Sequence, residues 1–439
     1  MSQSHVAWRT ICGLPPECYR CAPTVEGVLI VQPLKDVRVL AVTVFLAGPF
    51  LSMTLARFGA DVIKVEVPKG GDPVRSLGPF AGPKGVNPTK QTEQDIPTKF
   101  LKRTQGVQSV TLNLKDPEGR RLFLELAKQS DVVIENLAPG SMTRLGLGYA
   151  DVAAINPGIV YCSISGYGQD GPHADNPAHD HQIQAMAGLM DINGHPDGPP
   201  TRVGVYVSDL VTPLYSAFSI LAALRHKEQT GEGQYLDASM MDTLASLMFM
   251  EPLEEFLADG HPPRAGNNAR TGPTGLYHVK DADVIITVGH DHRYVALCEA
   301  LKAPELATDE RFDDAIKRAE NLEMLRAELQ NRFAQFECDE ILARLKERDV
   351  PVAPVRTLDK VLADPHFHDR GTLQPMRHSL VEEPIEDGIA VGFPIKFSSG
   401  ALPQMRGAPT LGMDNEEVFG RLLDLGAEDI QALKDKGVV

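Results

Sequence analysis

Short apolar runs alternate with helical segments through the first half of the chain. A run rich in valine and leucine, residues 37–43, predicts a buried strand, and Ala47-Gly48-Pro49 turns it into a helix over 50–58. Residues 60–66 predict the next strand, which completes a βαβ unit. Further strands are predicted at 110–114, 131–136 and 159–164, with a helix at 117–129. The pattern therefore predicts an α/β fold with a doubly wound parallel sheet.

The pattern changes in the second half. Helices are predicted at 181–190 and 214–226, and a long apolar segment follows at 237–256. Around residues 260–275 the composition shifts to Pro, Gly, Asn and Arg, which predicts a domain boundary and a smaller α/β domain beyond it. The predicted parts are an N-terminal extension (1–33), the first part of a large domain (34–235), a connecting helix (236–261), a small domain (262–350) and a return to the large domain (351–439).

Composition narrows the classes of partner. The 439 residues carry 43 basic and 59 acidic side chains, a net charge of −16, which argues against nucleic acid and anionic membranes. The six cysteines are sparse, as in proteins of a reducing cytosol, so a cytoplasmic location is expected. Cys18 and Cys21 have the C-x-x-C spacing without a second pair, and His290 and His292 lack further ligands, so no metal is expected. No dinucleotide or Walker A motif occurs, so no permanently bound cofactor is expected.

The stretch 156–209 is the best candidate for chemistry. Its apolar strand opens into the glycine-rich turn 165–172, and the carboxylate of Asp209 follows a second Gly/Pro loop. Ligands in open α/β sheets bind just beyond the carboxyl ends of strands, which favours a site here. An aspartate is also a common N-cap, so Asp209 could instead cap a helix that begins at Leu210. Spacing alone leaves both interpretations open.

The amino-acid sequence of this stretch resembles that of the class III CoA-transferases, whose fold is shared by alpha-methylacyl-CoA racemase. The segment Gly198-Pro199-Pro200-Thr201-Arg202-Val203-Gly204, followed by Asp209, is similar to the family's approach to its catalytic aspartate. The resemblance runs from about Leu34 to the C-terminus. It implies that acyl-CoA and a small carboxylic acid are the substrates, that the large domain binds CoA, and that two chains form an interlocked homodimer.

The resemblance also implies a reaction. Asp209 would attack an acyl-CoA thioester, forming first an aspartyl anhydride and then an aspartyl-CoA thioester that passes CoA to the acceptor acid. An ordinary aspartate is ionised at neutral pH, so no general base is needed. By the same resemblance, CoA contacts are expected at Leu46, Ala47, Leu112, Asn113, Leu114, Lys115, Asn136, Leu137, Ala138, Arg144, Pro177, Ala178, His179 and Asp180.

Two cations and a loop complete these expectations. Arg144 is the best candidate for a phosphate or adenine contact, and Arg202 is a candidate for a second carboxylate on the substrate. The loop 266–273 matches by location a mobile loop that covers the active site in some relatives. Leu46 stands where formyl-CoA transferase has a glutamine, which argues against the formyl/oxalate substrate pair.

Other activities of the same fold stay open. In a racemase, His179 and Asp209 would be an acid/base pair. Two features argue against it: residues 289–292 lack the supporting glutamate of racemases, and Leu210-Val211-Thr212-Pro213 stands where they have glycines. Movement of CoA within one dicarboxylate, or a non-catalytic CoA-binding role, are the remaining alternatives.

Overall fold

The computed structural model describes residues 29–439 except 252–253, 255–257, 259–263, 270 and 386–387. The chain divides into two compact units. The large unit contains the chain up to residue 187 together with 204–251 and 362–439, and the small unit contains 188–203 and 252–361. Most of the expected N-terminal extension, with Cys18 and Cys21, lies outside the described residues, as does part of the expected connecting helix.

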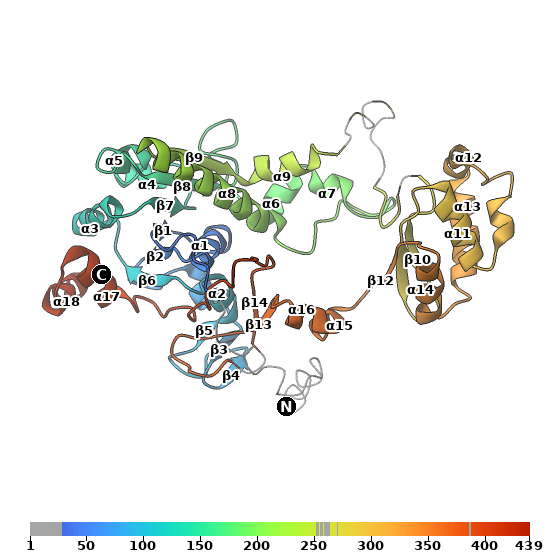
Figure 1. Cartoon of the computed structure of the whole chain (residues 1–439). Helices are drawn as coiled ribbons and strands as arrows, with labels where there is room; N and C mark the ends of the chain where they lie inside the picture. The colour runs from blue at the N-terminus through green and yellow to red at the C-terminus, as the bar shows by residue number, and fades with distance from the viewer. Residues whose placement is uncertain (1–28, 252–253, 255–257, 259–263, 270, 386–387) are drawn as a thin grey trace. The chain divides into compact units, whose positions relative to one another are not determined.

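A six-stranded parallel sheet forms the centre of the large unit (Figure 1). Every neighbouring pair of its strands is parallel. In sheet order the strands are β6 (Gln108–Thr111), β2 (Asp61–Glu66), β1 (Arg38–Val42), β7 (Val132–Glu135), β8 (Val160–Ser165) and β9 (Gln234–Ser239). The chain moves outward from β1 in one direction and then from β7 in the other. Strand order therefore reverses between β1 and β7, and such a switch point is where open α/β sheets bind ligands.

The strands are buried on both faces, as a parallel sheet requires. In β1, Val39, Leu40 and Ala41 are all fully buried. Leu40 belongs to the core packed against α3 (Pro117–Lys128), while α1 (Ala47–Arg57) and α8 (Val207–Thr230) pack against each other and the opposite face. Helix α3 begins at the predicted residue, because the Asp116 side chain caps it by accepting the Glu118 N–H at 2.8 Å.

Three elements differ between the prediction and the structure, and the first of them, a strand, occupies the start of the connecting helix expected at 236–261. Strand β9 was missed, because residues 234–239 run directly into helix α9 (Met240–Met248) without a glycine or proline between them. The helix predicted at 181–190 is two helices, α6 (Asp180–Met186) and α7 (Leu189–Ile192). Gly188 separates them with φ of +90°, a conformation that glycine adopts without strain. The helix predicted at 214–226 begins seven residues earlier, with Pro213 inside it.

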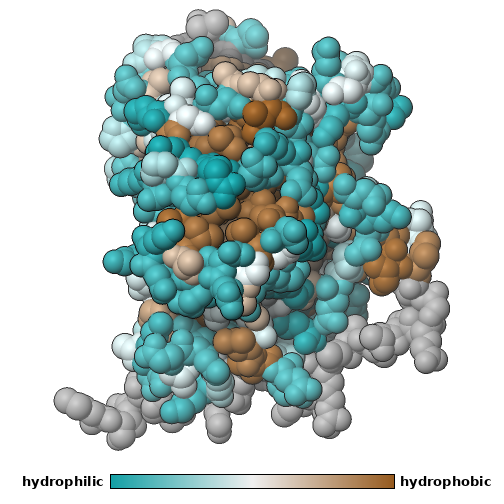
Figure 2. Space-filling model, turned by 90° about the vertical axis from the view of Figure 1, so that its left-hand side faces the viewer, coloured by the Kyte–Doolittle hydropathy of each residue, from teal (hydrophilic) through white to brown (hydrophobic). Residues whose placement is uncertain are grey.

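Helix α8 is only partly covered. By length and composition alone it could cross a membrane, and 44% of its most apolar window is buried inside the protein. Large apolar side chains on the same helix remain exposed: Leu214, Tyr215, Phe218 and Leu221. Figure 2 likewise shows apolar surface gathered in patches on one face rather than scattered singly. Patches of this kind mark interaction surfaces.

The small unit has its own sheet and core. Strands β10 (Gly275–His278), β11 (Asp283–Ile286) and β12 (Val352–Pro354) pair in antiparallel order. Helices α11 (Asp291–Ala300), α13 (Leu322–Phe333) and α14 (Cys338–Glu347) contribute side chains to the same core. The sequence predicts that the chain returns to the large domain at residue 351. In the structure β12 pairs with β11, and the small unit extends to residue 361.

The remaining elements are short or peripheral. Helices α17 (Asn415–Leu423) and α18 (Ala427–Asp435) bring the end of the chain back onto the core of the large unit. The others are η2 (Pro73–Ser76), β3 (Phe80–Gly82), β4 (Gly85–Asn87), β5 (Ile96–Pro97), α2 (Thr98–Arg103), α4 (Ser141–Arg144), α5 (Tyr149–Ala153), η3 (Pro304–Ala307), α12 (Ala315–Glu320), α15 (Leu358–Leu362), α16 (Pro365–Asp369), β13 (Leu373–Pro375) and β14 (Ile389–Val391).

Candidate active site

The turn after β1 is held from the end of β7. The Asn136 side chain accepts the Val44 N–H at 2.8 Å and donates to the Val44 carbonyl at 3.0 Å. Gly48 packs so closely beneath it that a Cβ there would lie 2.7 Å from the Asn136 side-chain oxygen. The amide of Asn136, a residue predicted to contact CoA, therefore holds the turn that carries Leu46 and Ala47.

The residue before Leu46 has an uncommon backbone, which the sequence did not reveal. Phe45 has φ of +64°, in the left-handed region that side chains other than glycine rarely adopt. Its N–H donates to Asp72 Oδ1 at 3.2 Å, and Asp72 is ion-paired with Lys64 at 3.0 Å. Both partners of this pair are 1% exposed, and Lys64 also donates to the Thr43 carbonyl. Because strained backbone is retained where the surroundings fix it and clusters at functional sites, the turn at Phe45 is a candidate for one.

Asp209 lies in the first turn of α8 and does not act as its cap. The helix begins at Val207, with Tyr206 at the N-cap position and no side-chain capping bond. The interpretation of Asp209 as the cap of a helix beginning at Leu210 is therefore wrong. The carboxylate is half-buried, and among the described residues none forms a hydrogen bond or ion pair with it.

The surroundings of Asp209 hold its proton more tightly than usual. Burial and, to a smaller extent, the nearby Asp180 carboxylate raise the pKa of Asp209, Arg103 opposes them, and the pKa that results is about 6. A carboxyl with a pKa of about 6 is still mostly ionised at pH 7. It is also less well solvated than a surface aspartate, which makes it a better nucleophile.

Asp180 has the opposite environment. It is 1% exposed, and its Oδ1 accepts both the backbone N–H and the hydroxyl of Ser208, each at 2.8 Å. Its Oδ2 accepts from Gln184 Nε2 at 2.7 Å. The Asp180 side chain, predicted to contact CoA, thus satisfies a free N–H in the first turn of α8 and fixes the residue next to Asp209.

His179 stands beside Asp180 at the start of α6. Its ring packs edge-on against Phe45, with 5.9 Å between ring centroids, and the residue is exposed. Phe45 and His179 therefore connect the turn after β1 to the first turns of α6 and α8. The structure brings Leu46, Ala47, His179, Asp180 and Asp209 into one neighbourhood of the large unit.

The other predicted CoA contacts follow the carboxyl ends of β6, β7 and β8. The side chains of Leu112 and Leu114 belong to the hydrophobic core. Lys115 and Arg144 are exposed, and Arg144 donates to the Pro139 carbonyl and the Ser141 hydroxyl. The Asn113 side chain accepts the Lys115 N–H, and the Leu137 N–H donates to the Glu135 carboxylate. Ala138 and Pro177 are exposed, and Ala178 is half-buried. The contacts of all these residues with CoA stay predictions.

Several other features lie outside this neighbourhood. Arg202 and the 266–273 loop belong to the small unit, with Arg270 of that loop outside the described residues. The Arg202 guanidinium donates to the Val203 carbonyl. Asp291, between His290 and His292, is ion-paired with Arg318. Within the described part of the chain, no group of three or more His, Cys, Asp or Glu residues is arranged to hold a metal.

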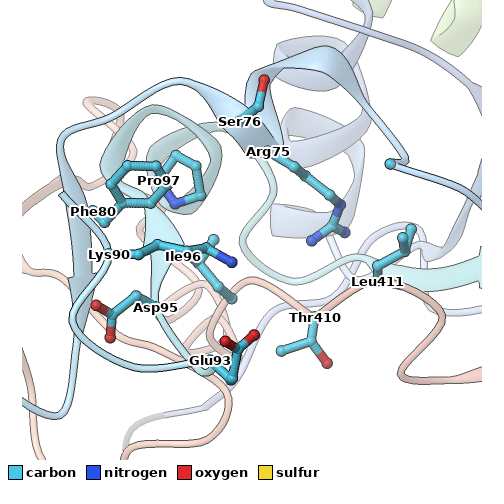
Figure 3. Close-up of a pocket in the computed structure, with 11 residues that line it drawn as sticks. Arg75, Ser76, Phe80, Lys90, Glu93, Asp95, Ile96, Pro97, Thr410 and Leu411 are labelled. Carbon is cyan, nitrogen blue, oxygen red and sulfur yellow. The ribbon is translucent and has the colours of Figure 1, made fainter.

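A pocket of about 530 Å³ opens between the β3–β5 sheet and the segment at Thr410 and Leu411 (Figure 3). The charged ends of Arg75, Lys90 and Glu93 face this space. Arg75 is already engaged, because its guanidinium forms two hydrogen bonds with Glu66 at 2.6 and 2.7 Å. None of the predicted site residues lines the pocket.

Comparison with known proteins agrees with the resemblance noted in the sequence. A family model described as CoA-transferase family III matches residues 34–415. A succinyl-CoA:mesaconate CoA-transferase of Haloarcula marismortui is 37% identical, over 91% of this chain and 99% of that protein. A succinyl-CoA:glutarate CoA-transferase of Mus musculus is 32% identical, over 93% of this chain and 90% of that protein. A crystal structure of a CAIB/BAIF family protein from Brucella suis superimposes with a TM-score of 0.77, at 34% identity, over 89% of this chain and all of that one.

Proposed function

Because this chain belongs to CoA-transferase family III, we propose that it moves coenzyme A from an acyl-CoA thioester to a small carboxylic acid, with Asp209 as the nucleophile. One observation carries the assignment of Asp209. Its carboxylate is half-buried in the first turn of α8 and has no bonded partner among the described residues. A carboxylate used only for structure is expected to be bonded, as Asp180 is.

The proposed reaction needs only this carboxylate and the two substrates. An Asp209 oxygen attacks the donor carbonyl, the C–S bond breaks, and CoA leaves as thiolate from an aspartyl anhydride. The thiolate then attacks the aspartyl carbonyl, which releases the donor acid as carboxylate and leaves an aspartyl-CoA thioester. The acceptor carboxylate attacks this thioester to give a second anhydride and CoA thiolate. Attack of the thiolate on the acceptor carbonyl releases the new acyl-CoA and restores Asp209.

The position of Asp209 at the N-terminus of α8 suits a reaction whose steps carry negative charge. The N-terminal turn of a helix carries partial positive charge, which stabilises an ionised carboxylate. The same charge stabilises the negative charge that develops on the aspartyl oxygen when a thiolate or an acceptor carboxylate attacks the aspartyl carbonyl. The carboxylate is ionised at neutral pH despite its raised pKa, so the first step needs no proton transfer.

Two further points concern the substrates and the alternative reaction. Succinate, mesaconate and glutarate, the acids in the names of the two relatives, each carry two carboxylates, and we extend this class to the present chain. An acyl-CoA isomerase acting through His179 and Asp209 is less well supported. The His179 ring packs on Phe45, and the charged groups that act on the Asp209 carboxylate are Asp180 and Arg103.

We also propose that the protein is a homodimer of interlocked chains. The apolar side chains left exposed on α8 need a covering surface, and a second copy of the chain provides one. Interlocked chains separate only by unfolding. Sedimentation velocity over a wide dilution series should therefore show one dimeric species, and a monomer that grows with dilution would refute the interlocked arrangement.

The test of Asp209 uses the intermediates themselves. Enzyme incubated with an acyl-CoA donor and no acceptor should accumulate the aspartyl-CoA thioester, because the acceptor step cannot follow. Hydroxylamine should convert it to a hydroxamate and borohydride should reduce it to an alcohol, and peptide mapping should place either mark on Asp209. Asp209→Asn should lose the mark and at least about a thousandfold in turnover, since the nucleophile is removed.

The matched control is Asp175→Asn, which changes an exposed carboxylate of the same stretch. It should keep both the mark and the turnover. A mark on Asp175 or Asp180, or normal turnover in Asp209→Asn, would show that Asp209 is not the nucleophile. Rapid exchange of deuterium into the acyl α-carbon without any mark would favour the racemase.

A further inference from the structure

Helix α2 ends in two neighbouring cations that differ in their surroundings. Lys102 is exposed, whereas Arg103 is half-buried and donates from Nη1 to the Phe45 carbonyl at 3.0 Å. Across the part of the chain that the structure describes, no carboxylate lies within ion-pairing distance of Arg103. Partial burial lowers the pKa of both cations, and the guanidinium of Arg103 remains charged at neutral pH. A half-buried cation without an ion-pair partner is costly unless an anion reaches it in function.

The support beneath Arg103 is rigid. Its acceptor, the Phe45 carbonyl, belongs to the residue whose left-handed backbone is fixed by Asp72. Asp72 is in turn fixed by the buried ion pair with Lys64 and by accepting the Val74 N–H at 3.0 Å. The guanidinium is therefore placed by main chain that a buried network holds, and no other hydrogen bond of its N–H groups is formed within the described part of the chain.

Contacts connect both Arg103 and Asp209 to the turn after β1. The Phe45 ring contacts His179, the adjacent Asp180 binds Ser208, and Ser208 is followed by Asp209. The two charges also act on each other: Asp209 supports the charge of Arg103, and Arg103 lowers the pKa of Asp209 against the effect of burial. Their separation exceeds the 4 Å of an ion pair, so Arg103 stands near the nucleophile without neutralising it.

We propose that Arg103 binds the distal carboxylate of a dicarboxylic substrate while the other end of that substrate reacts at Asp209. This inference rests on the proposed function and adds the residue that selects the substrate. A dicarboxylic acyl group keeps one negative charge after its first carboxylate has become a thioester or anhydride, and Asp180 and Asp209 would repel that charge. A guanidinium offers paired N–H donors that match a carboxylate, which offsets the repulsion and fixes the orientation of the substrate.

The diphosphate of CoA is a less suitable partner for Arg103. The thioester sulfur must reach Asp209, and the diphosphate lies at the other end of the long pantetheine arm. A cation that acts electrostatically on Asp209 is therefore near the acyl group and far from the phosphates. Arg202, the cation that the sequence suggested for a second carboxylate, is exposed and belongs to the small unit.

The experiment compares acids of equal chain length with and without the second charge. Steady-state kcat/KM is measured with one acyl-CoA donor and either succinate or butyrate as acceptor, in wild type, Arg103→Met, Arg103→Lys and Lys102→Met. In Arg103→Met we expect kcat/KM for succinate to fall roughly 10- to 100-fold, the range of a charge-assisted contact, and that for butyrate to change less than about threefold. Arg103→Lys should keep part of the preference, because it retains the charge and loses the paired donors.

Lys102→Met removes the same charge from the neighbouring, exposed position and should leave the ratio of the two acids unchanged. The ratio is measured within each variant, so partial loss of folded protein does not alter it. Equal losses for both acids in Arg103→Met would overturn the inference. So would a raised Kd for CoA with an unchanged ratio, or a changed ratio in Arg202→Met alone.

Failure of this inference can be told from failure of the proposed function. If Asp209 of the wild type is labelled by an acyl-CoA donor and Arg103→Met keeps the preference for succinate, only the role of Arg103 is refuted. If the wild type neither labels at Asp209 nor exchanges CoA with any acid, both are refuted.

Discussion

The first turns of α6 and α8 each contain an aspartate, and the protein treats the two carboxylates in opposite ways. Asp180, in α6, is 1% exposed and accepts three hydrogen bonds, two of them from Ser208. Asp209, in α8, is half-buried and has no hydrogen-bond partner among the residues that the structure describes. Both were drawn from one stretch of sequence by the same resemblance. Their bonding, which only the structure shows, separates a positioning residue from a candidate nucleophile.

The two environments depend on each other. By bonding Ser208, Asp180 satisfies a free N–H of α8 and also brings negative charge close to Asp209. Together with burial, that charge keeps the pKa of Asp209 at about 6. The same contact therefore orders the helix and makes the neighbouring carboxylate less stable in its ionised form. The comparison predicts that replacing Asp180 lowers the free energy of unfolding and that replacing Asp209 removes the activity.

The larger expected effect on stability comes from Asp180→Ala. The substitution leaves the Ser208 N–H and hydroxyl and the Gln184 amide without this acceptor in a buried place. We expect the free energy of unfolding to fall by about 2–4 kcal/mol, as when buried donors to a charged acceptor lose it. Urea denaturation followed by circular dichroism measures the change.

Asp175→Ala is the control for this measurement, because Asp175 is exposed in the same stretch. Its free energy of unfolding should stay within about 0.5 kcal/mol of wild type. If Asp180→Ala is as stable as Asp175→Ala, the bonds to Ser208 do not support α8 and the contrast between the two aspartates is lost.

Much of this arrangement follows from sequence pattern. The strands β1, β2, β7 and β8 and helix α3 are close to their predicted positions, because a parallel sheet needs continuous apolar runs and α3 has a side-chain cap and an early proline. Strand β9 escaped prediction because no turn residue separates it from α9. The beginning of α8 escaped because Asp180, distant in sequence, supplies the acceptor that a local cap would provide.

The site was predictable in part. Resemblance assigned a catalytic role to Asp209 and CoA contacts to the turn after β1, and the structure brings these residues into one neighbourhood. The resemblance did not indicate that Asn136 would hold Val44, or that Phe45 would be left-handed, because both depend on contacts between separate strands. Nor did it select Arg103 over Arg202, since the sequence does not say which cation acts on Asp209. A left-handed phenylalanine leaves no signal in a single sequence.

The smaller expected effect on stability comes from Asp209→Asn, and it has the opposite sign. An ionised, half-buried carboxylate without partners destabilises the folded state, and asparagine removes the charge while keeping the shape. At pH 8 we expect Asp209→Asn to be more stable than wild type by about 1–2 kcal/mol, after the raised pKa is discounted for partial exposure to solvent. Denaturant unfolding at a series of pH values measures the difference.

The dependence of this gain on pH distinguishes it from an ordinary packing effect. The pKa of Asp209 is about 6 in the folded state and roughly 3.9 when unfolded, so the unfolded chain loses the proton first as pH rises. The cost of ionising Asp209 in the folded state is therefore absent below about pH 4, grows between pH 4 and 6, and is complete above that range. The advantage of Asp209→Asn over wild type should follow the same course, while Asp175→Asn should show none. An advantage that is constant from pH 4 to pH 8, or a loss of stability at pH 8, would mean that Asp209 is not the unpaired carboxylate on which its assignment as nucleophile depends.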